Sequence, residues 1–193
     1  KMEKSKKVES LMTGKGREKI PNFAFRGMAF IMELMDLFTN YSNRNIRNLN
    51  IKSGQTVIDY GCGPARYIKD ASRMVGASGK VIAIDIHPLA LKKVNEKMKK
   101  YKLSNVYATL AIGYKTDIES EIADVVYALD MFHMIEQPAE LLTELCRLVK
   151  RDGRVIIEDG HQPRSETKMK IEDSKILNIV RETKSFVECI KMK

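Results

Sequence analysis

The sequence predicts an α/β protein, with a doubly wound, mostly parallel sheet of seven strands, helices on both faces and a C-terminal antiparallel hairpin. This arrangement is a three-layer α/β/α sandwich. First, five short apolar runs alternate with segments of helical periodicity. Second, four of these runs lead into acidic residues, as expected where parallel strands meet at one functional edge. Third, two segments near the C-terminus alternate apolar and polar residues around a short polar loop, which is typical of a hairpin.

The helices are predicted from apolar positions spaced three and four residues apart, bounded by Pro, Gly and Ser. Pro21 marks the entry to the first helix, and Gly76 marks the end of the third. We predict helices over residues 23–38, 42–49, 67–76, 89–101, 138–149 and 166–174. The first helix is rich in Met and Phe, a composition compatible with an adaptable pocket lining and equally with core packing.

The strands are predicted from apolar runs too short for helices and rich in β-branched residues. Glycine-containing turns at Ser53-Gly54, at Ser78-Gly79 and over residues 150–153 lead into three of them. We predict strands over residues 57–59, 81–84, 105–111, 123–129, 154–158, 177–182 and 186–191.

Size and composition are those of one globular domain over residues 1–193. No apolar run approaches the ~20 residues that span a bilayer, and the Lys-rich start lacks the apolar region of a signal peptide. We expect this charged start, residues 1–20, to be mobile. Three scattered cysteines, Cys62, Cys146 and Cys189, argue against a disulfide framework and favour the cytoplasm.

One stretch carries the functional signal: Val57-Ile58-Asp59-Tyr60-Gly61-Cys62-Gly63-Pro64-Ala65-Arg66. It predicts a buried strand that ends in an acid and turns through two glycines into a helix. Glycines allow positive φ and let the backbone approach a ligand closely. Asp85 ends the next strand, 22 positions after Gly63. This is near the ~20 expected when a second acid binds a nucleotide ribose.

The third glycine of a dinucleotide-binding fingerprint is absent, because Arg66 stands in its place. That glycine serves close helix–strand packing over a pyrophosphate. The substitution disfavours an NAD-dependent oxidoreductase and fits a ligand that has a ribose but no pyrophosphate.

The pattern Asp59-x-Gly61-x-Gly63, followed by the strand that ends in Asp85, resembles the class I, Rossmann-like S-adenosylmethionine-dependent methyltransferases. Residues 123–160 resemble the same class through Asp130-x-x-His133 and the Asp152-Gly153 turn. The resemblance implies a Rossmann-like core over residues 54–193 and an N-terminal helical cap, residues 1–50, that covers the site. It further implies a small-molecule methyltransferase of the kind that includes ubiquinone/menaquinone and sterol-type enzymes.

The resemblance also implies roles for individual residues. Asp59, Gly61 and Gly63 would hold the methionine part of S-adenosylmethionine, and Cys62, a small residue in the same loop, is also assigned to the cofactor site. Asp85 would bind the ribose hydroxyls and Ile86 would pack on the adenine. Leu129 and Asp130 would lie beside the transferred methyl group. An acid that usually follows the third strand is missing, since Ile112 and Gly113 occupy that region, so backbone groups or a water would contact the adenine.

The acidic strand ends support this interpretation independently. Acids grouped at one edge need a cationic partner or a raised pKa, and the cofactor's sulfonium and amino group are such cations. The alternative is that some of these acids cap the helices that follow them.

Methyl transfer is an in-line displacement, to which an enzyme contributes alignment and exclusion of water. A general base helps where the nucleophile carries a proton, and His133 is the first candidate, with His161 second. A structural role for His133 is the alternative. No metal is predicted: Asp130, His133, Glu158, Asp159 and His161 could gather at one edge, but no pair has a recognised ligand spacing.

The net charge of +9 raises the question of a nucleic-acid partner. The dense basic patch, Lys92–Lys102, lies on one amphipathic helix, and a solvated helix face explains it. A small-molecule substrate is therefore the first prediction. An RNA or protein methyltransferase that uses the Lys92–Lys102 face is the second, and a catalytically silent nucleotide-binding module is the third. The oligomeric state is left open.

Overall fold

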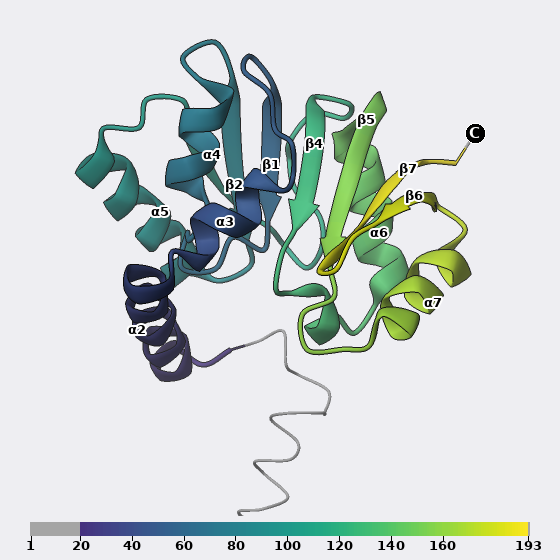
Figure 1. The fold of residues 1–193 in the computed structure, drawn as a ribbon, viewed down its shortest axis with the longest axis horizontal. Coiled ribbons are helices and arrows are strands. Elements are labelled where there is room, and N and C mark those ends of the chain that lie inside the picture. The colour runs from purple at the N-terminus through teal and green to yellow at the C-terminus, as the bar shows by residue number, and fades with distance from the viewer. Residues whose placement is uncertain (1–19, 193) are drawn as a thin grey trace, which may run out of the picture.

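The computed structural model describes residues 20–192, so the predictions for the charged start fall almost wholly outside the described residues. Within this range seven strands form one sheet in the order β3-β2-β1-β4-β5-β7-β6 (Figure 1). The parallel strands are β1 (Thr56–Tyr60), β2 (Lys80–Asp85), β3 (Val106–Leu110), β4 (Ala123–Ala128) and β5 (Val149–Glu158). The hairpin of β6 (Leu177–Glu182) and β7 (Phe186–Lys191) adds antiparallel to β5. The predicted fold class is confirmed.

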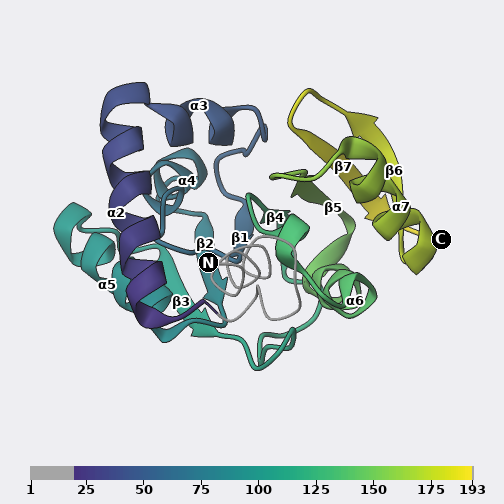
Figure 2. The same cartoon turned by 90° about the horizontal axis from the view of Figure 1, so that it is seen from below.

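Helices cover both faces of this sheet. They are α2 (Asn22–Thr39), α3 (Tyr41–Arg47), α4 (Ile68–Val75), α5 (Pro88–Tyr101), α6 (Pro138–Leu148) and α7 (Arg164–Ser174), with a 3-10 turn, η1, over Phe132–Met134. Figure 2 shows α2 to α5 gathered on one side of the strands and α6 and α7 on the other. No helix in the described part of the chain combines the length and apolar character needed to cross a bilayer.

The apolar core is divided into two layers by the sheet. Val57 of β1 packs with α4 and α5, while its neighbour Ile58 packs with α6. Successive side chains of a strand point to opposite faces, so a strand buried on both faces must be apolar throughout. This double burial explains why the central strands read as continuous apolar runs rather than alternating ones.

The element boundaries differ from the prediction mainly at β5. Residues 150–153 were predicted as a turn, but they lie within β5, whose register with β4 shifts between Ala123 and Val125. Gly153 makes this irregularity possible, since a Cβ there would lie 2.6 Å from Cγ2 of Val149. The strand therefore continues through these residues as a bulge between the pairs Ala123–Val149 and Val125–Arg154.

Helix α2 presents only one of its sides to the rest of the protein. Phe25 and Ala29 are buried, whereas Phe23 and Phe38 are 80% and 79% exposed. The expectation that the Met and Phe residues of this helix serve a pocket or the core therefore holds for part of the set. Phe23, Phe30, Leu34, Met35 and Phe38 face outward.

An ion pair ties α2 to the start of α4. Arg66, 7% exposed, donates from Nε and Nη2 to the two carboxylate oxygens of Asp36, at 2.9 and 2.6 Å. The guanidinium also lies over the ring of Tyr41, 5.1 Å from its centroid. The residue that replaces the fingerprint's third glycine thus holds the N-terminal helix against the core.

We expect Asp36→Ala to release α2, because it leaves the largely buried Arg66 without its carboxylate. A buried group deprived of its partner costs about 1–3 kcal/mol. Amide hydrogen exchange of α2 should accelerate by ~10-fold or more, while exchange in the sheet stays constant. Glu33→Ala is the matched control, since the Glu33–Lys93 pair is more exposed and contributes little. Equal exchange rates in the two variants would show that the Arg66 contact does not hold α2.

Candidate active site

The turn after β1 is built by its two glycines. Gly61 and Gly63 have φ values of 77° and 48°, a region that residues with a Cβ seldom occupy. The amides of Gly61 and Cys62 both donate to the carbonyl of Ile84 in β2, at 2.8 and 2.9 Å. The turn is therefore held against the end of the neighbouring strand, with the backbone of Gly63 directed toward Asp85.

Asp85 joins the ends of β1 and β2. Its Oδ2 accepts from the amide of Gly63 and its Oδ1 from the amide of His87, each at 2.8 Å. Burial raises the pKa of Asp85, and these two amides act in the opposite direction. The bond to His87, the residue before α5, also gives Asp85 part of the capping role considered as an alternative.

Asp59 lies beneath the turn and is 1% exposed. Its Oδ2 makes no hydrogen bond of normal geometry within residues 20–192. Burial raises the pKa of Asp59 to about 8, and the Asp85 carboxylate adds to the increase. Two acids at this edge thus lack a cation, which is the electrostatic condition that the sequence predicted.

A cavity of about 660 Å³ opens at the carboxyl ends of the strands, the lower edge of the sheet in Figure 1. Its lining includes most of the residues that the sequence assigned to a cofactor: Gly61, Cys62, Gly63, Asp85, Ile86, Leu129 and Asp130. Asp59 is not part of the lining, and neither is His133. Cys62 is buried with its pKa raised well above the ordinary value, mainly by burial, so its thiol stays protonated and unreactive.

An apolar part of the cavity wall comes from two separate segments. Phe25, Met28 and Met32 extend from α2, and Met131 and Met134 lie around η1. Methionine side chains adapt to irregular shapes, so this wall suits an apolar molecule of variable outline.

His87 was not predicted to take part in the site, yet it lines the cavity. Its ring stacks on Phe25 with centroids 4.5 Å apart, and its Nδ1 accepts from the amide of Leu89 at 3.1 Å. The His87-Pro88 pair was a usable signal, because a capping side chain before Pro marks a helix start. Arg66 offered no such signal, since its partner Asp36 lies 30 positions away.

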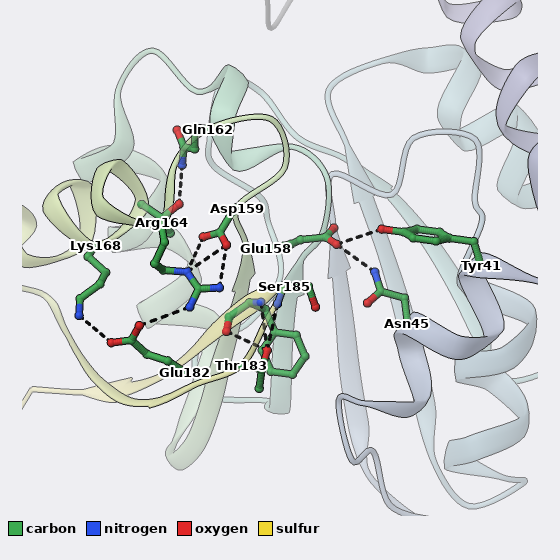
Figure 3. A network of polar contacts seen from close by, with 12 residues as sticks. Tyr41, Asn45, Glu158, Asp159, Gln162, Arg164, Lys168, Glu182, Thr183 and Ser185 are labelled. Atoms are coloured by element: carbon green, nitrogen blue, oxygen red, sulfur yellow. Dashed lines mark hydrogen bonds and ion pairs between the residues drawn. The ribbon is translucent and has the colours of Figure 1, made fainter.

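The acids at the end of β5 are already engaged, as Figure 3 shows. Glu158 accepts from Asn45 Nδ2 at 3.0 Å and from the Tyr41 hydroxyl at 3.3 Å. Asp159 accepts three hydrogen bonds from Arg164, at 2.7–2.9 Å. The cation that Asp159 needs is thus supplied by the protein itself, and not by a ligand as the grouping of acids suggested.

Asp130, His133 and His161 come together beside the cavity. One ligating atom of each lies within 4.8 Å of those of the other two. The rings of His133 and His161 meet edge to face, with centroids 4.9 Å apart. Burial raises the pKa of Asp130, whereas His161 and Arg66 act to lower it. The two histidines named from the sequence are therefore neighbours, and Asp130 is the member of the group that lines the cavity.

A doubly wound sheet with a glycine turn and an acid-lined cavity at its carboxyl edge defines a nucleotide-type ligand site. A family model described as a methyltransferase domain matches residues 51–191. The chain belongs to this family of S-adenosylmethionine-dependent methyltransferases, and S-adenosylmethionine is its cofactor.

Similar proteins support the same assignment. A demethylmenaquinone methyltransferase of Oceanobacillus iheyensis is 25% identical over 118 residues, covering 61% of this chain and 50% of that protein. A probable cobalt-precorrin-6B C(15)-methyltransferase of Saccharolobus solfataricus is 27% identical over 113 residues, covering 58% and 56%. The chain thus spans about half the length of these curated relatives. A SAM dependent methyltransferase from Aquifex aeolicus has a similar structure, with a TM-score of 0.67 and 27% identity over 80% of this chain and 89% of that one.

The raised pKa of Asp59 predicts how stability depends on pH. Between the ordinary Asp pKa near 4 and about 8, the unfolded chain releases a proton that the folded chain keeps. Asp59 therefore makes the free energy of unfolding fall as pH rises through this window. We expect the free energy of unfolding of Asp59→Asn to rise relative to that of the wild type by at most ~1.4 kcal/mol for each unit of increasing pH in this window.

Urea unfolding at several pH values from 5 to 8 measures this difference. Asp117→Asn is the control, because Asp117 is exposed and its substitution should leave the pH dependence unchanged. Parallel curves for the wild type and Asp59→Asn would contradict the assigned pKa.

Proposed function

We propose that this chain binds S-adenosylmethionine in the 660 Å³ cavity and transfers its methyl group to a small, largely apolar acceptor. The observation that carries the proposal is the contact between Gly63 and Asp85 directly above the uncompensated acid Asp59. This arrangement offers a close backbone approach, a ribose-binding carboxylate and a negative potential in one place.

The residues present fit the cofactor. The buried Asp59 carboxyl lies next to the turn of Gly61, Cys62 and Gly63, and a cationic methionine part bound at this turn would favour its charged form. Asp85 is placed to bind the ribose hydroxyls, and the half-exposed Ile86 offers an apolar surface to the adenine. The backbone of Ala111 and Gly113, which also line the cavity, replaces the missing acid after β3.

When bound, the cofactor supplies an electrophilic methyl group on a sulfonium sulfur, open to in-line displacement. Leu129 and Asp130, at the end of β4, flank the position we assign to that methyl group. The apolar wall excludes water and orients the acceptor, which is the main contribution an enzyme makes to such a displacement. We assign His133 a role on the acceptor side through Asp130, since Asp130 lines the cavity and its carboxylate lies within 4.8 Å of a ring nitrogen of His133.

The acceptor wall favours a small apolar molecule. Met28, Met32, Met131 and Met134 give the cavity a flexible, apolar part, bordered by the polar residues Glu136, Gln137 and Glu140. Helix α2 contributes Phe25, Met28 and Met32 to the lining, which supports the predicted cap for its described part, residues 20–50. The relatives' names, a demethylmenaquinone and a cobalt-precorrin methyltransferase, are those of enzymes with small acceptors, which supports the same class here.

The alternative of an RNA or protein acceptor depends on the Lys92–Lys102 face. Part of its charge is internally paired: Lys93 contacts Glu33 and Glu96, and Lys97 donates to the carbonyl of Ala65 at 3.0 Å. Burial lowers the pKa of Lys97. The exposed remainder fits a solvated helix face better than a polyanion site.

We expect Asp85→Ala to weaken binding of S-adenosylhomocysteine by roughly 30- to 150-fold, since two charge-assisted hydrogen bonds to a ribose contribute about 2–3 kcal/mol. Isothermal calorimetry measures this, with Asp117→Ala as the control that should retain wild-type affinity. Because Asp85 also holds Gly63, Asp85→Asn is a second variant that retains an acceptor oxygen. Wild-type affinity in both Asp85 variants would contradict the cofactor site.

We expect transfer of labelled methyl groups to demethylmenaquinol, as a probe of a small apolar acceptor, and none to RNA. Charge reversal of the exposed lysines, Lys92→Glu, Lys99→Glu and Lys100→Glu together, should leave the rate unchanged within ~2-fold. RNA labelling that disappears in this variant and falls steeply with salt would favour the RNA function instead. Binding of S-adenosylhomocysteine without methyl transfer to either acceptor would favour the catalytically silent nucleotide-binding module.

A further inference from the structure

We propose that Asp130, His133 and His161 form a binding site for a divalent transition-metal cation at the wall of the acceptor cavity. The three side chains come from the segments that follow β4 and β5, which neighbour each other in the sheet. Two imidazoles and one carboxylate are a donor set suited to such ions, and the imidazoles favour zinc, cobalt, nickel or iron over magnesium and calcium.

The distances are compatible with one shared ion. Ligating atoms of the three residues lie within 4.8 Å of one another. With metal–ligand bonds of about 2.0–2.2 Å, the ligands of one ion lie roughly 3–3.5 Å apart. Side-chain rotation can close the remaining gap, because His161 is exposed and Asp130 and His133 are only partly buried.

The other acids at the same edge of the sheet differ from these three residues because protein groups already bind them. The Glu158 carboxylate is bound by Asn45 and Tyr41, and Asp159 is bound by Arg164 (Figure 3). Asp130 is therefore the carboxylate at the ends of β4 and β5 that reaches both the cavity and the histidine pair.

Charge at this position favours a cation. The Asp130 carboxylate lies close enough to the Glu158 carboxylate for their charges to repel each other. The Oε2 atom of Glu158 is buried and makes no hydrogen bond within the described residues. A divalent ion held by Asp130 would offset the repulsion between these two carboxylates.

The backbone holds the group in an uncommon geometry. Asp130 has a φ of 55°, a left-handed conformation that costs free energy in a residue other than glycine. Gly160 has a φ of 62°, and a Cβ there would overlap the ring of His133. The close approach of His133 to the end of β5 therefore requires glycine at position 160.

The role of this metal site in catalysis rests on the proposed methyltransferase function, whereas the binding of a metal ion does not depend on it. Three protein ligands leave coordination positions open, as in catalytic metal sites. Since Asp130 lines the cavity, an open position would face the acceptor. A hydroxyl oxygen held there would lose its proton to solvent more readily, and the acceptor would be fixed beside Leu129.

The test is a titration of the chelator-treated full chain with Co²⁺ and Zn²⁺. We expect one Co²⁺ ion to bind per chain with a visible ligand-field absorption band, and Zn²⁺ to displace it. Asp130→Asn, His133→Gln and His161→Gln should each weaken Co²⁺ binding by ~10-fold or more. His87→Gln and Asp159→Asn are matched controls that should retain it, because His87 lies outside the group and Asp159 is bound by Arg164.

Measuring S-adenosylhomocysteine binding by the same samples distinguishes a failure of the metal site from a failure of the cofactor site. Loss of Co²⁺ binding without loss of S-adenosylhomocysteine binding in the three variants would support the metal site. A wild-type chain that binds S-adenosylhomocysteine but no Co²⁺ would overturn the metal site alone. Co²⁺ binding that persists in both His133→Gln and His161→Gln would likewise overturn it, whatever the cofactor result.

Discussion

The contact between the Asp85 carboxylate and the Gly63 amide is the constraint on which the site depends. It connects the turn after β1 to the end of β2, strands that are neighbours in the sheet but separated by the whole of α4. The parallel arrangement makes this contact possible, because the carboxyl ends of adjacent strands meet at one edge. The same carboxylate receives the amide of His87 and thereby orients the start of α5. One side chain thus sets both the glycine turn and the helix that borders the cavity.

The concentration of acids at this edge has a cost in the absence of a cation. Asp59, Asp85, Asp130 and Glu158 all have raised pKa values, chiefly because burial penalises their charged forms. The protein as a whole carries a net charge of +9. In the described part of the cavity lining, by contrast, acids outnumber the basic side chains, and Arg66 there is already paired with Asp36. A cationic cofactor beside Asp59 and a metal ion beside Asp130 would relieve the cost in two distinct places.

Three side-chain contacts hold the N-terminal helices α2 and α3 beside the cavity. Arg66 binds Asp36, His87 stacks on Phe25, and Glu158 binds Asn45 and Tyr41. Each joins the N-terminal helices to the carboxyl edge of the sheet, so α2 and α3 are held where they face the site. Arg66 has a particular importance, because it stands where a dinucleotide-binding protein has glycine and uses the position to anchor the cap instead.

The sequence by itself determined the strands, the helices, the hairpin, the glycine turn and the position of Asp85, because each depends on periodicity or spacing along the chain. It also determined which residues end the strands, and hence two of the four acids in the described cavity lining, Asp85 and Asp130, while Glu136 and Glu140 were not predicted. Only the tertiary structure decided how those acids are used. Glu158 and Asp159 are bound by Asn45 and Arg164, while Asp130 faces the cavity and meets His133 and His161. It also decided which face of α2 lies inward and that residues 150–153 form a bulge within β5. The physical reason is that these outcomes depend on side-chain direction and on partners up to 117 positions away, which leave no local pattern in the sequence.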